Sequence, residues 1–280
     1  MDILQLILLS FIQGLTEFLP VSSSAHLVLL SEFLGEEDQG IIFDVGVHFG
    51  TLMAALVYFR SDLQKMVVNL GSHNLFSQEN SLTINLVIAV IPILLTGFLL
   101  RDFVDLNLRN SQVIAYATIV FGILLYVAQF KETEGGLDTL NIKKALIIGI
   151  FQCLALIPGT SRSGITITAG LLLGLGAREA SRFSFLLAIP TIGAIALAEL
   201  IRISFIDFTQ SGIELSVALI ISFLVAYISI DMFLRLIEKI GFTPFVIYRL
   251  LLGIGLLMFW TLKNSNFYLL PTKKTKTKKL

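Results

Sequence analysis

The chain has 280 residues, of which 55% are hydrophobic and only 14% charged, and its mean hydropathy is +0.87. A soluble domain carries about 25% charged residues, so this composition excludes an ordinary water-soluble fold and predicts an integral membrane protein. Basic and acidic residues number 20 each, and the resulting zero formal net charge gives no general attraction to nucleic acid. At the start of the chain, residues 1–19 are apolar but carry Asp2 in place of a basic segment, so we expect them to be retained and not cleaved as a signal peptide.

Six segments contain the roughly 20 mostly apolar residues that a membrane-spanning helix needs. They are residues 41–60, 82–101, 112–130, 183–201, 213–235 and 244–262. Only short polar connectors separate them, so no segment is long enough for a separate soluble domain. The fold class that we expect is an all-α polytopic membrane protein.

Two further apolar stretches are interrupted in the middle. Residues 3–34 are broken by the run Pro20 to Ser24, and residues 144–175 by the run Pro158 to Gly164. Each half is about 12–17 residues long, too short to cross the bilayer alone, and a proline ends the preceding helix. Irregular backbone at membrane depth needs protein or water around it. The pattern predicts two re-entrant helical hairpins whose tips lie inside the protein; two kinked spanning helices are the alternative.

The two breaks are similar to each other, which indicates a tandem duplication. A serine-rich run follows both Pro20 and Pro158, and further on Gly50-Thr51 corresponds to Pro190-Thr191 at nearly the same offset. The first repeat would cover 1–130 (hairpin 3–34 plus three spans), and the second 131–265 (hairpin 144–175 plus three spans), before a basic tail at 266–280. An odd number of spans in each half inverts the second copy in the membrane, and such folds bring their broken helices together near the midplane.

Basic residues near the ends of the spans predict which side faces the cytoplasm. The side with fewer basic residues would carry Arg101, Arg109 and Arg202 next to an acidic run at 36–38. We expect the side with more basic residues to be cytoplasmic and the candidate site to open to the outer face, although Lys263 and the tail lysines fall on the outer side and oppose this orientation. The side with more basic residues would carry Arg60, Lys65, Lys131, Lys143, Lys144, Arg178, Arg182, Arg235 and Lys239.

Ionisable side chains inside membrane segments cost several kcal/mol, on the order of 3, and are therefore candidates for function. Glu17 lies near the end of the first half-helix, one turn after Gln13, so both project from one face. If the two tips meet, they combine one carboxylate, one imidazole, one guanidinium and several hydroxyls. Besides Glu17, the tips supply Ser22, Ser23, Ser24, His26, Ser161, Arg162, Ser163 and Thr166.

This set of groups suits phosphoryl transfer. Arg162 offers a planar fork of donors that matches phosphate oxygens, and Gly159 and Gly164 would let backbone approach an oxyanion closely. Glu17 could act as a base or hold a divalent cation, and His26 could donate a proton or act as the nucleophile. Each residue also has a structural alternative: the serines could cap a helix, His26 could be a packing residue, and Arg162 could extend to the lipid headgroups.

At these residues the chain resembles the bacitracin-resistance family of undecaprenyl-diphosphate phosphatases. Residues 13–26, QGLTEFLPVSSSAH, resemble the first signature of that family, and residues 158–166, PGTSRSGIT, resemble the second. A third stretch, TPFVIYR at 243–249, is also similar. The resemblance spans the whole length, and the first two motifs together are highly specific.

The resemblance implies an enzyme that removes the terminal phosphate of undecaprenyl diphosphate, recycles the lipid carrier for cell-wall synthesis and confers bacitracin resistance. It also implies a divalent cation, magnesium in the first place and calcium in the second. Carried over by position, the catalytic residues would be Glu17, Ser23, His26 and Arg162. The substrate-binding residues would be Ser22, Ser24, Gly159, Ser161, Ser163, Thr166 and Arg249.

The metal ligands would be Glu17 and Gln13. Relatives often have glutamate where this chain has Gln13, although glutamine also occurs there, and the change weakens a site that needs two carboxylates around the metal. The nucleophile stays open between Ser23, a water activated by Glu17, and His26, in that order of preference.

The expected partners are a polyprenyl diphosphate lipid and the lipid bilayer, without nucleic acid, and a homodimer stays open. The expected location is the bacterial plasma (inner) membrane, crossed several times. Two other classes of function compete with this interpretation. An inverted-repeat lipid flippase or anion transporter would use the same site without hydrolysis, whereas a structural scaffold would have no use for Glu17 and Arg162 inside the membrane.

Overall fold

The computed structural model of the chain describes residues 3–23, 25–27, 30, 41–70, 81–131, 133–200 and 212–268. Within these ranges the regular elements are helices, and the β-type pairing is limited to an isolated bridge between Gly135 and Leu175. Backbone groups in a bilayer must be satisfied within the protein, which a helix does within its own segment. The all-α class predicted from the sequence is confirmed.

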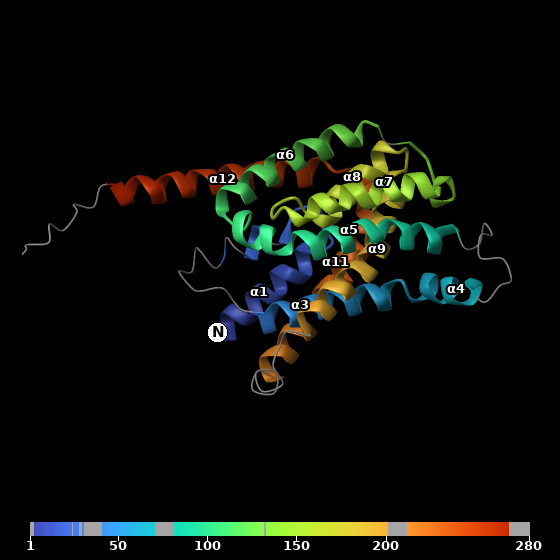
Figure 1. Cartoon of the computed structure of the whole chain (residues 1–280), viewed down its shortest axis with the longest axis horizontal. Coiled ribbons are helices and arrows are strands. Elements are labelled where there is room, and N and C mark those ends of the chain that lie inside the picture. Colours follow the sequence, from blue (N-terminus) through green and yellow to red (C-terminus); the bar gives the residue numbers. More distant parts are fainter. Residues whose placement is uncertain are drawn as a thin grey trace, which may run out of the picture.

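Among the described residues, five helices are long and apolar enough to cross a membrane. They lie where five of the six spans were predicted, with ends that differ by a few residues. Figure 1 shows α6 and α12 side by side along the long axis of the molecule, in agreement with their contacts. The five are α5 (Ser81–Asn107), α6 (Ser111–Gln129), α9 (Ala177–Leu200), α11 (Gly212–Ile240) and α12 (Thr243–Tyr268).

The remaining predicted span, residues 41–60, is α3 (Ile41–Tyr58), and α4 (Arg60–Leu70) follows it directly. The apolar part of α3 is shorter than the five spanning helices. Much of its surface packs against α11 and α9, and Val47 and Ala54 are fully buried. This helix therefore forms part of the centre of the protein.

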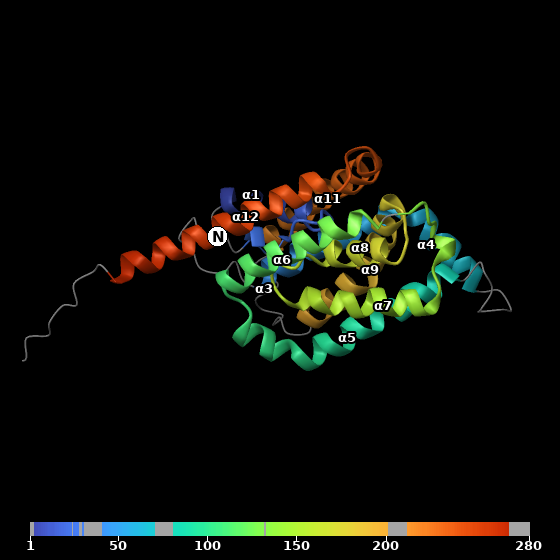
Figure 2. The same ribbon diagram turned by 90° about the horizontal axis from the view of Figure 1, so that it is seen from above.

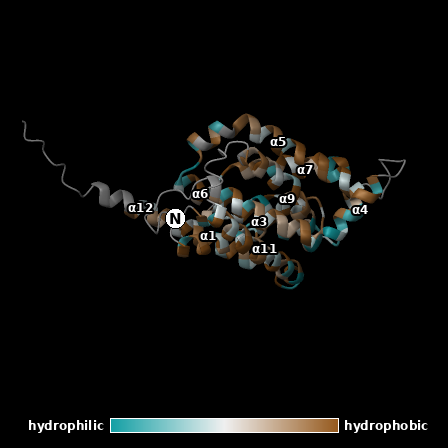
Figure 3. Cartoon of the chain, turned by 90° about the horizontal axis from the view of Figure 1, so that it is seen from below, coloured by the Kyte–Doolittle hydropathy of each residue, from teal (hydrophilic) through white to brown (hydrophobic). Residues whose placement is uncertain are grey.

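The outward surfaces of the long helices are strongly apolar. Phe98, Leu106 and Ile213 are 85%, 84% and 82% exposed, and a soluble protein rarely presents large side chains of this kind over a continuous surface. Figure 3 shows hydrophobic residues over most of the helices and hydrophilic ones around α4. The chain is a multi-pass membrane protein, and lipid chains are the natural contacts of this surface.

The second broken stretch forms a hairpin. A short 3₁₀ helix, η2 (Leu137–Thr139), precedes α7 (Ile142–Cys153), which continues into η3 (Leu154–Leu156); after the break, α8 begins at Arg162 and ends at Leu172. Helices α7 and α8 contact each other, whereas the two halves of one kinked spanning helix would diverge from the kink. The re-entrant interpretation is therefore the one that the structure supports for this stretch.

The first broken stretch begins with α1 (Ile3–Thr16) and turns at residues 17–21. Helical backbone resumes at Ser23 and includes residues 25–27 and 30. Ser24, one of the predicted substrate-binding residues, lies outside the described residues. The turn lies where the sequence predicted the break, directly around Pro20.

Helices of the two predicted repeats pack in a reciprocal way. Helix α1 packs against α11, and α7, its counterpart in the second repeat, packs against α5, the counterpart of α11. The counterparts α3 and α9 contact each other, as do α6 and α12. Figure 2 shows α5 and α7 on one side of the molecule and α1 and α11 on the other. Two copies related by a two-fold axis would pair in this way, which favours the predicted duplication; the repeat boundaries stay a prediction.

Small residues allow the closest of these helix contacts. A Cβ at Gly50 would lie 2.4 Å from the Leu219 carbonyl oxygen, and one at Gly14 would lie 2.7 Å from that of Ser222. Within a bilayer, van der Waals contact between backbones is a main source of helix association. Helices α1 and α3 are thus held against α11, and this contact fixes the starting point of the first hairpin tip.

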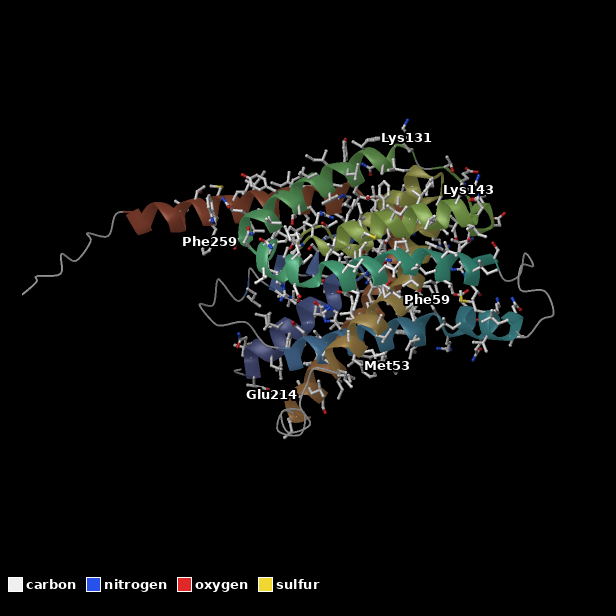
Figure 4. All side chains as sticks on the ribbon, in the orientation of Figure 1. Met53, Phe59, Lys131, Lys143, Glu214 and Phe259 are labelled. Carbon is white, nitrogen blue, oxygen red and sulfur yellow. The ribbon has the colours of Figure 1, made fainter. Side chains whose placement is uncertain are left out.

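Two of the predicted cytoplasmic lysines lie at the same end of the molecule. Lys131 and Lys143 are found there, and Phe259 lies toward the other end (Figure 4). That this end faces the cytoplasm stays a prediction.

Candidate active site

An ion pair joins the two hairpin tips. Arg162 is the first residue of α8, and its Nη2 donates to Glu17 Oε1 at 2.8 Å, although 145 residues separate them in the chain. The side chains are only 13% and 8% exposed. The expectation that the tips bring an acid and a guanidinium together is met. In a low-dielectric setting each charge needs the other, because an unpaired buried charge is costly.

The second carboxylate oxygen of Glu17 binds two further donors. Gln13 Nε2 lies 2.8 Å from Glu17 Oε2, and Ser23 Oγ donates to the same oxygen at 3.0 Å. Gln13 lies one helical turn before Glu17, so the spacing of four residues places the amide on the same face. Arg162, Gln13 and Ser23 thus all donate to one carboxyl group, and the Ser23 hydroxyl already lies within hydrogen-bond distance of the oxygen that would accept its proton.

The guanidinium of Arg162 has two other neighbours. Its Cζ lies 5.7 Å from the centre of the Phe18 ring, a cation–π distance, and its Nη1 lies 3.4 Å from the Ser184 carbonyl oxygen. Phe18 in turn packs edge-on against Phe185 at a centroid distance of 5.2 Å. The arginine is thus held between an aromatic face from one tip and a carbonyl of α9.

The backbone of the two tips is unusual in the same way. Ser22 has φ of 73° and Ser161 has φ of 69°, a left-handed conformation that few non-glycine residues adopt. Ser161 is the N-cap of α8, and its Oγ accepts from the Gly164 amide at 3.1 Å. Both serines are largely buried. Their positions favour the capping role over direct contact with a substrate.

Ser163 and Thr166 form hydrogen bonds that hold the backbone around Arg162 in place. Ser163 Oγ donates to the Leu19 carbonyl at 2.9 Å, a bond from the second tip to the first. Thr166 Oγ1 lies 2.9 Å from the Arg162 carbonyl oxygen and 2.7 Å from Ser184 Oγ. Each residue is 1% exposed. Because the protein itself engages both hydroxyls, these residues are better placed to position Arg162 than to touch the headgroup.

His26 lies one turn beyond the first tip and both of its ring nitrogens are engaged. Nδ1 lies 2.7 Å from the Ser22 carbonyl oxygen, and Nε2 lies 2.5 Å from the Tyr248 hydroxyl. Tyr248 belongs to α12, far away in the sequence. The third motif therefore reaches the site, through a residue that the sequence analysis did not single out.

Arg249, predicted to bind substrate, is fully buried at 0% exposure. Its Nε donates to the Thr118 carbonyl at 3.1 Å, and its Nη2 donates to the Gly159 and Thr160 carbonyls at 3.0 and 2.8 Å. Its Nη1 lies 3.4 Å from the Pro20 carbonyl oxygen. One guanidinium thus binds the backbone of both tips and of α6. This position favours a structural role over the predicted contact with substrate.

The two tip glycines serve packing. A Cβ at Gly159, whose φ is +94°, would lie 2.3 Å from the Ile114 carbonyl oxygen of α6, and a Cβ at Gly164 would lie 2.9 Å from Arg249 Nη1. The predicted close approach of their backbone to an oxyanion stays a prediction. The packing shows that α6 and Arg249 come close to these two glycines.

His48 is a neighbour of the site that the sequence analysis missed. It projects from α3, its Nδ1 lies 2.7 Å from the Asp44 carbonyl oxygen, and it lies within electrostatic range of the Glu17 carboxylate. The rule that singled out Glu17, an ionisable group within an apolar span, applies equally to His48 and would have found it.

The residues around Glu17 could hold a divalent cation only together with oxygens of a bound phosphate group. Gln13 Oε1 is buried with no hydrogen-bond partner, and it is an oxygen of the kind that Mg²⁺ and Ca²⁺ prefer. No group of three or more His, Cys, Asp or Glu side chains that could hold a metal ion occurs in the part of the chain that the structure describes. Mg²⁺ is often held by one or two protein oxygens together with phosphate oxygens, and Glu17 with Gln13 suits that arrangement.

Comparison with known proteins places the chain in a family. The family described as bacitracin resistance protein BacA matches residues 6–255. Undecaprenyl-diphosphatase 1 of Pseudoalteromonas translucida is 48% identical over 267 residues, which cover 94% of this chain and 100% of that protein. The undecaprenyl-diphosphatase of Saccharophagus degradans is 50% identical over 262 residues, which cover 91% of this chain and 97% of that protein. This chain therefore belongs to the bacitracin resistance protein BacA family.

Proposed function

We propose that the chain hydrolyses undecaprenyl diphosphate to undecaprenyl phosphate and inorganic phosphate, and so recycles a lipid carrier for cell-wall synthesis. The observation that carries this proposal is the pairing of Glu17 with Arg162 across the two tips, with Ser23 bonded to the same carboxylate. Relatives that cover almost all of the chain are named undecaprenyl-diphosphatases, which supports the choice of substrate.

Arg162 would bind the diphosphate without releasing Glu17. A guanidinium has five N–H donors in a planar fork, and Glu17 and Ser184 engage one donor each. Donors that remain in the fork suit phosphate oxygens, which arginine binds with strong, charge-assisted hydrogen bonds. The same group would then stabilise the charge that builds up on the transferring phosphoryl group, and this is the main task in phosphoryl transfer.

The contact between Ser23 and Glu17 supplies a nucleophile and a base. Glu17 would take the Ser23 proton while Ser23 Oγ forms a bond to the terminal phosphorus. The bond from that phosphorus to the bridging oxygen breaks, and undecaprenyl phosphate leaves with both electrons of the bond. Glu17 then gives up the Ser23 proton to solvent. Water attacks the phosphoserine phosphorus as Glu17 takes a proton from it, the bond from phosphorus to Ser23 Oγ breaks, and Glu17 returns that proton to Ser23 Oγ as inorganic phosphate is released. If Glu17 activates water directly, the same products form in one step, and Ser23 only orients the carboxylate.

We also propose a divalent cation, Mg²⁺ before Ca²⁺, as cofactor. Glu17 and Gln13 would hold it, and when bound it would neutralise charge on the diphosphate oxygens. Gln13 would turn its unpartnered Oε1 toward the cation. In its protonated form His26 would donate its Nε2 proton to the leaving phosphate, and Tyr248 and the Ser22 carbonyl hold its ring in place.

The membrane location is part of the proposal. We infer the bacterial plasma membrane, with the polyprenyl tail in lipid and the headgroup at the tips, on the outer face. Sealed right-side-out vesicles test the orientation: an impermeant inhibitor should block hydrolysis. Full activity in its presence would place the site on the cytoplasmic side.

The reaction itself is tested with purified protein in detergent. Farnesyl or undecaprenyl diphosphate should release inorganic phosphate and leave the prenyl monophosphate, and chelation of divalent cations should stop the release. Binding of the lipid without phosphate release would contradict the proposal and favour the flippase or transporter alternative. Purified Glu17→Ala protein at the same concentration is the control for contaminating phosphatases.

A further inference from the structure

Tyr248 and His26 form a contact that the proposed mechanism has so far used only to hold the imidazole. The hydroxyl of Tyr248 lies 2.5 Å from His26 Nε2. The two rings are nearly parallel, with an interplanar angle of 2° and a centroid distance of 5.5 Å. The contact joins α12 of the second repeat to the helix that leaves the first tip.

The partners of His26 determine where its hydrogen lies. Nδ1 faces the Ser22 carbonyl at 2.7 Å, and a carbonyl oxygen can only accept, so Nδ1 must carry the hydrogen. A neutral imidazole has one N–H and one lone pair, and the lone pair is therefore on Nε2. Tyr248 consequently donates its hydroxyl hydrogen to Nε2.

Tyr248 is held firmly, because its neighbour in the chain is anchored to both tips. Arg249 binds the carbonyls of Gly159 and Thr160 and approaches that of Pro20, while Tyr248 remains 44% exposed. The two neighbours in the third motif thus have different tasks. Arg249 fixes the loops, and the register that it imposes on α12 places the Tyr248 hydroxyl at the imidazole.

We propose that Tyr248 is a positioning residue that keeps His26 in the Nδ1–H tautomer and reserves Nε2 for proton transfer. The functional part of this proposal rests on the phosphatase activity proposed above. Attack on phosphorus by His26 needs a lone pair on a ring nitrogen. Nδ1 has none in this tautomer, and the lone pair of Nε2 accepts from the Tyr248 hydroxyl, in a hydrogen bond along which a proton can move but which leaves no free lone pair for phosphorus. The contact therefore excludes His26 as the nucleophile in this arrangement and leaves it the role of proton carrier.

Nitrogen NMR tests the tautomer without reference to activity. The chain has three histidines, His26, His48 and His73, so ¹⁵N-histidine labelling gives a simple spectrum, and loss of a signal in His26→Gln assigns it. At about pH 8, above the titration range of an ordinary imidazole, wild-type His26 should show a protonated Nδ1 and a lone-pair Nε2. In Tyr248→Phe this pattern should shift toward a mixture of tautomers.

His48 is the internal control for this experiment. Its Nδ1 faces the Asp44 carbonyl at 2.7 Å, independently of Tyr248, so its signals should stay unchanged in Tyr248→Phe and show that the variant is folded. A wild-type His26 with its hydrogen on Nε2, or an unchanged His26 pattern in Tyr248→Phe, would overturn the proposal.

Kinetics tests the consequence for turnover. In Tyr248→Phe we expect kcat to fall about tenfold or more, within the range for general acid–base catalysis, while KM changes little because the headgroup contacts of Arg162 remain. The matched control is Tyr116→Phe, which removes a hydroxyl from a residue of α6 that is 57% exposed and should keep wild-type kcat. An altered tautomer with unchanged kcat would contradict the functional half of the proposal. Absence of phosphate release by the wild type would instead refute the phosphatase assignment and leave the NMR result standing.

Discussion

Ser22 and Ser161 both have a positive φ at corresponding places in the two hairpins, 73° and 69°. Each directly precedes the helix that leaves its tip, and among the described residues they are the non-glycine positions with positive φ. A conformation of this kind costs about 1–3 kcal/mol and persists only where the surroundings fix it. Arg249 and the bond from Ser163 to Leu19 supply that constraint, because each joins protein groups at the two tips.

Glu17→Ala and Arg162→Ala should each reduce kcat by at least about 100-fold, or roughly 3 kcal/mol of barrier. Glu17→Ala removes the acceptor for Ser23, and Arg162→Ala removes the donor for the developing charge. Phosphate release from purified, folded protein is the measurement. Arg162→Lys should also be poor, because a point charge cannot replace the planar fork.

The control for this pair is Arg235→Ala. Arg235 pairs with Asp231 on the surface of α11, and its side chain is 75% exposed, so its loss should leave kcat near the wild-type value. Wild-type turnover in Glu17→Ala or Arg162→Ala would show that the site lies elsewhere.

Ser23→Ala distinguishes the two routes to the product. If Ser23 is the nucleophile, the variant should lose about 1,000-fold or more in kcat, since no other hydroxyl replaces a covalent intermediate. Acid quenching of the wild type with substrate labelled in its terminal phosphate should then trap label on the protein, and Ser23→Ala should trap none. A loss within about tenfold, with no trapped label in the wild type, would favour the water activated by Glu17.

The meeting of Glu17 with Arg162 could be predicted from sequence, because both are charged residues at breaks in apolar segments, where lipid contact is too costly. The helical spans were predicted equally well, since length and hydropathy alone determine them. The full burial of Arg249 could not be predicted. Its position in α12 does not show which face of that helix meets the tips. In the sequence, an arginine that will bind backbone carbonyls looks the same as one that will bind phosphate.

The contact of Gly159 with α6 could not be predicted for a related reason. A glycine in a loop beside serines is compatible with a bound oxyanion or with a neighbouring helix, and only the packing of α6 against the tip distinguishes the two. Tyr248 belongs to the third motif at residues 243–249, but its partner His26 lies in the other repeat, so the motif alone does not indicate their contact. Contacts between repeats depend on how the two halves are rotated relative to each other, which periodicity along one chain does not encode.

Gln13→Glu should change the dependence on divalent cation. Gln13 Nε2 lies 2.8 Å from Glu17 Oε2, so the substitution places a second carboxylate beside the first. Two adjacent carboxylates attract a cation and repel each other without one. We expect the Mg²⁺ concentration for half-maximal activity to fall about tenfold, equivalent to ~1.4 kcal/mol. The same Mg²⁺ dependence in Gln13→Glu and wild type would argue against these two residues as ligands, and Gln5→Glu, elsewhere on α1, serves as the comparison.

Gly159→Ala should destabilise the protein, whereas Gly255→Ala should not. A Cβ at Gly159 would lie 2.3 Å from a backbone carbonyl of α6 and would have to adopt φ of +94°, while one at Gly255 in α12 meets nothing within 4 Å. Strain and overpacking of this kind cost about 1–3 kcal/mol each, and alanine within a helix is favoured by about 0.5–1 kcal/mol over glycine. Thermal unfolding in detergent should show a lower midpoint for Gly159→Ala alone. Equal midpoints would mean that the tip can move away from α6.

Arg249→Met tests whether this residue holds the tips or binds the substrate. Removing the guanidinium leaves the Thr160 carbonyl without its donor in a fully buried place and takes one of two donors from the Gly159 carbonyl, which Thr118 Oγ1 also binds. An unsatisfied buried carbonyl costs about 1–3 kcal/mol, so we expect a loss in that range. For a chain of this size that lowers the midpoint of thermal unfolding by roughly 2–12 °C, and kcat should fall because both tips lose their anchor. Arg235→Met, at the exposed pair on α11, should shift the midpoint little. If Arg249→Met kept the wild-type midpoint and raised only KM, the guanidinium would be a substrate ligand after all. It would then have to leave the carbonyls when the diphosphate binds, and the tips would be free to open during each turnover.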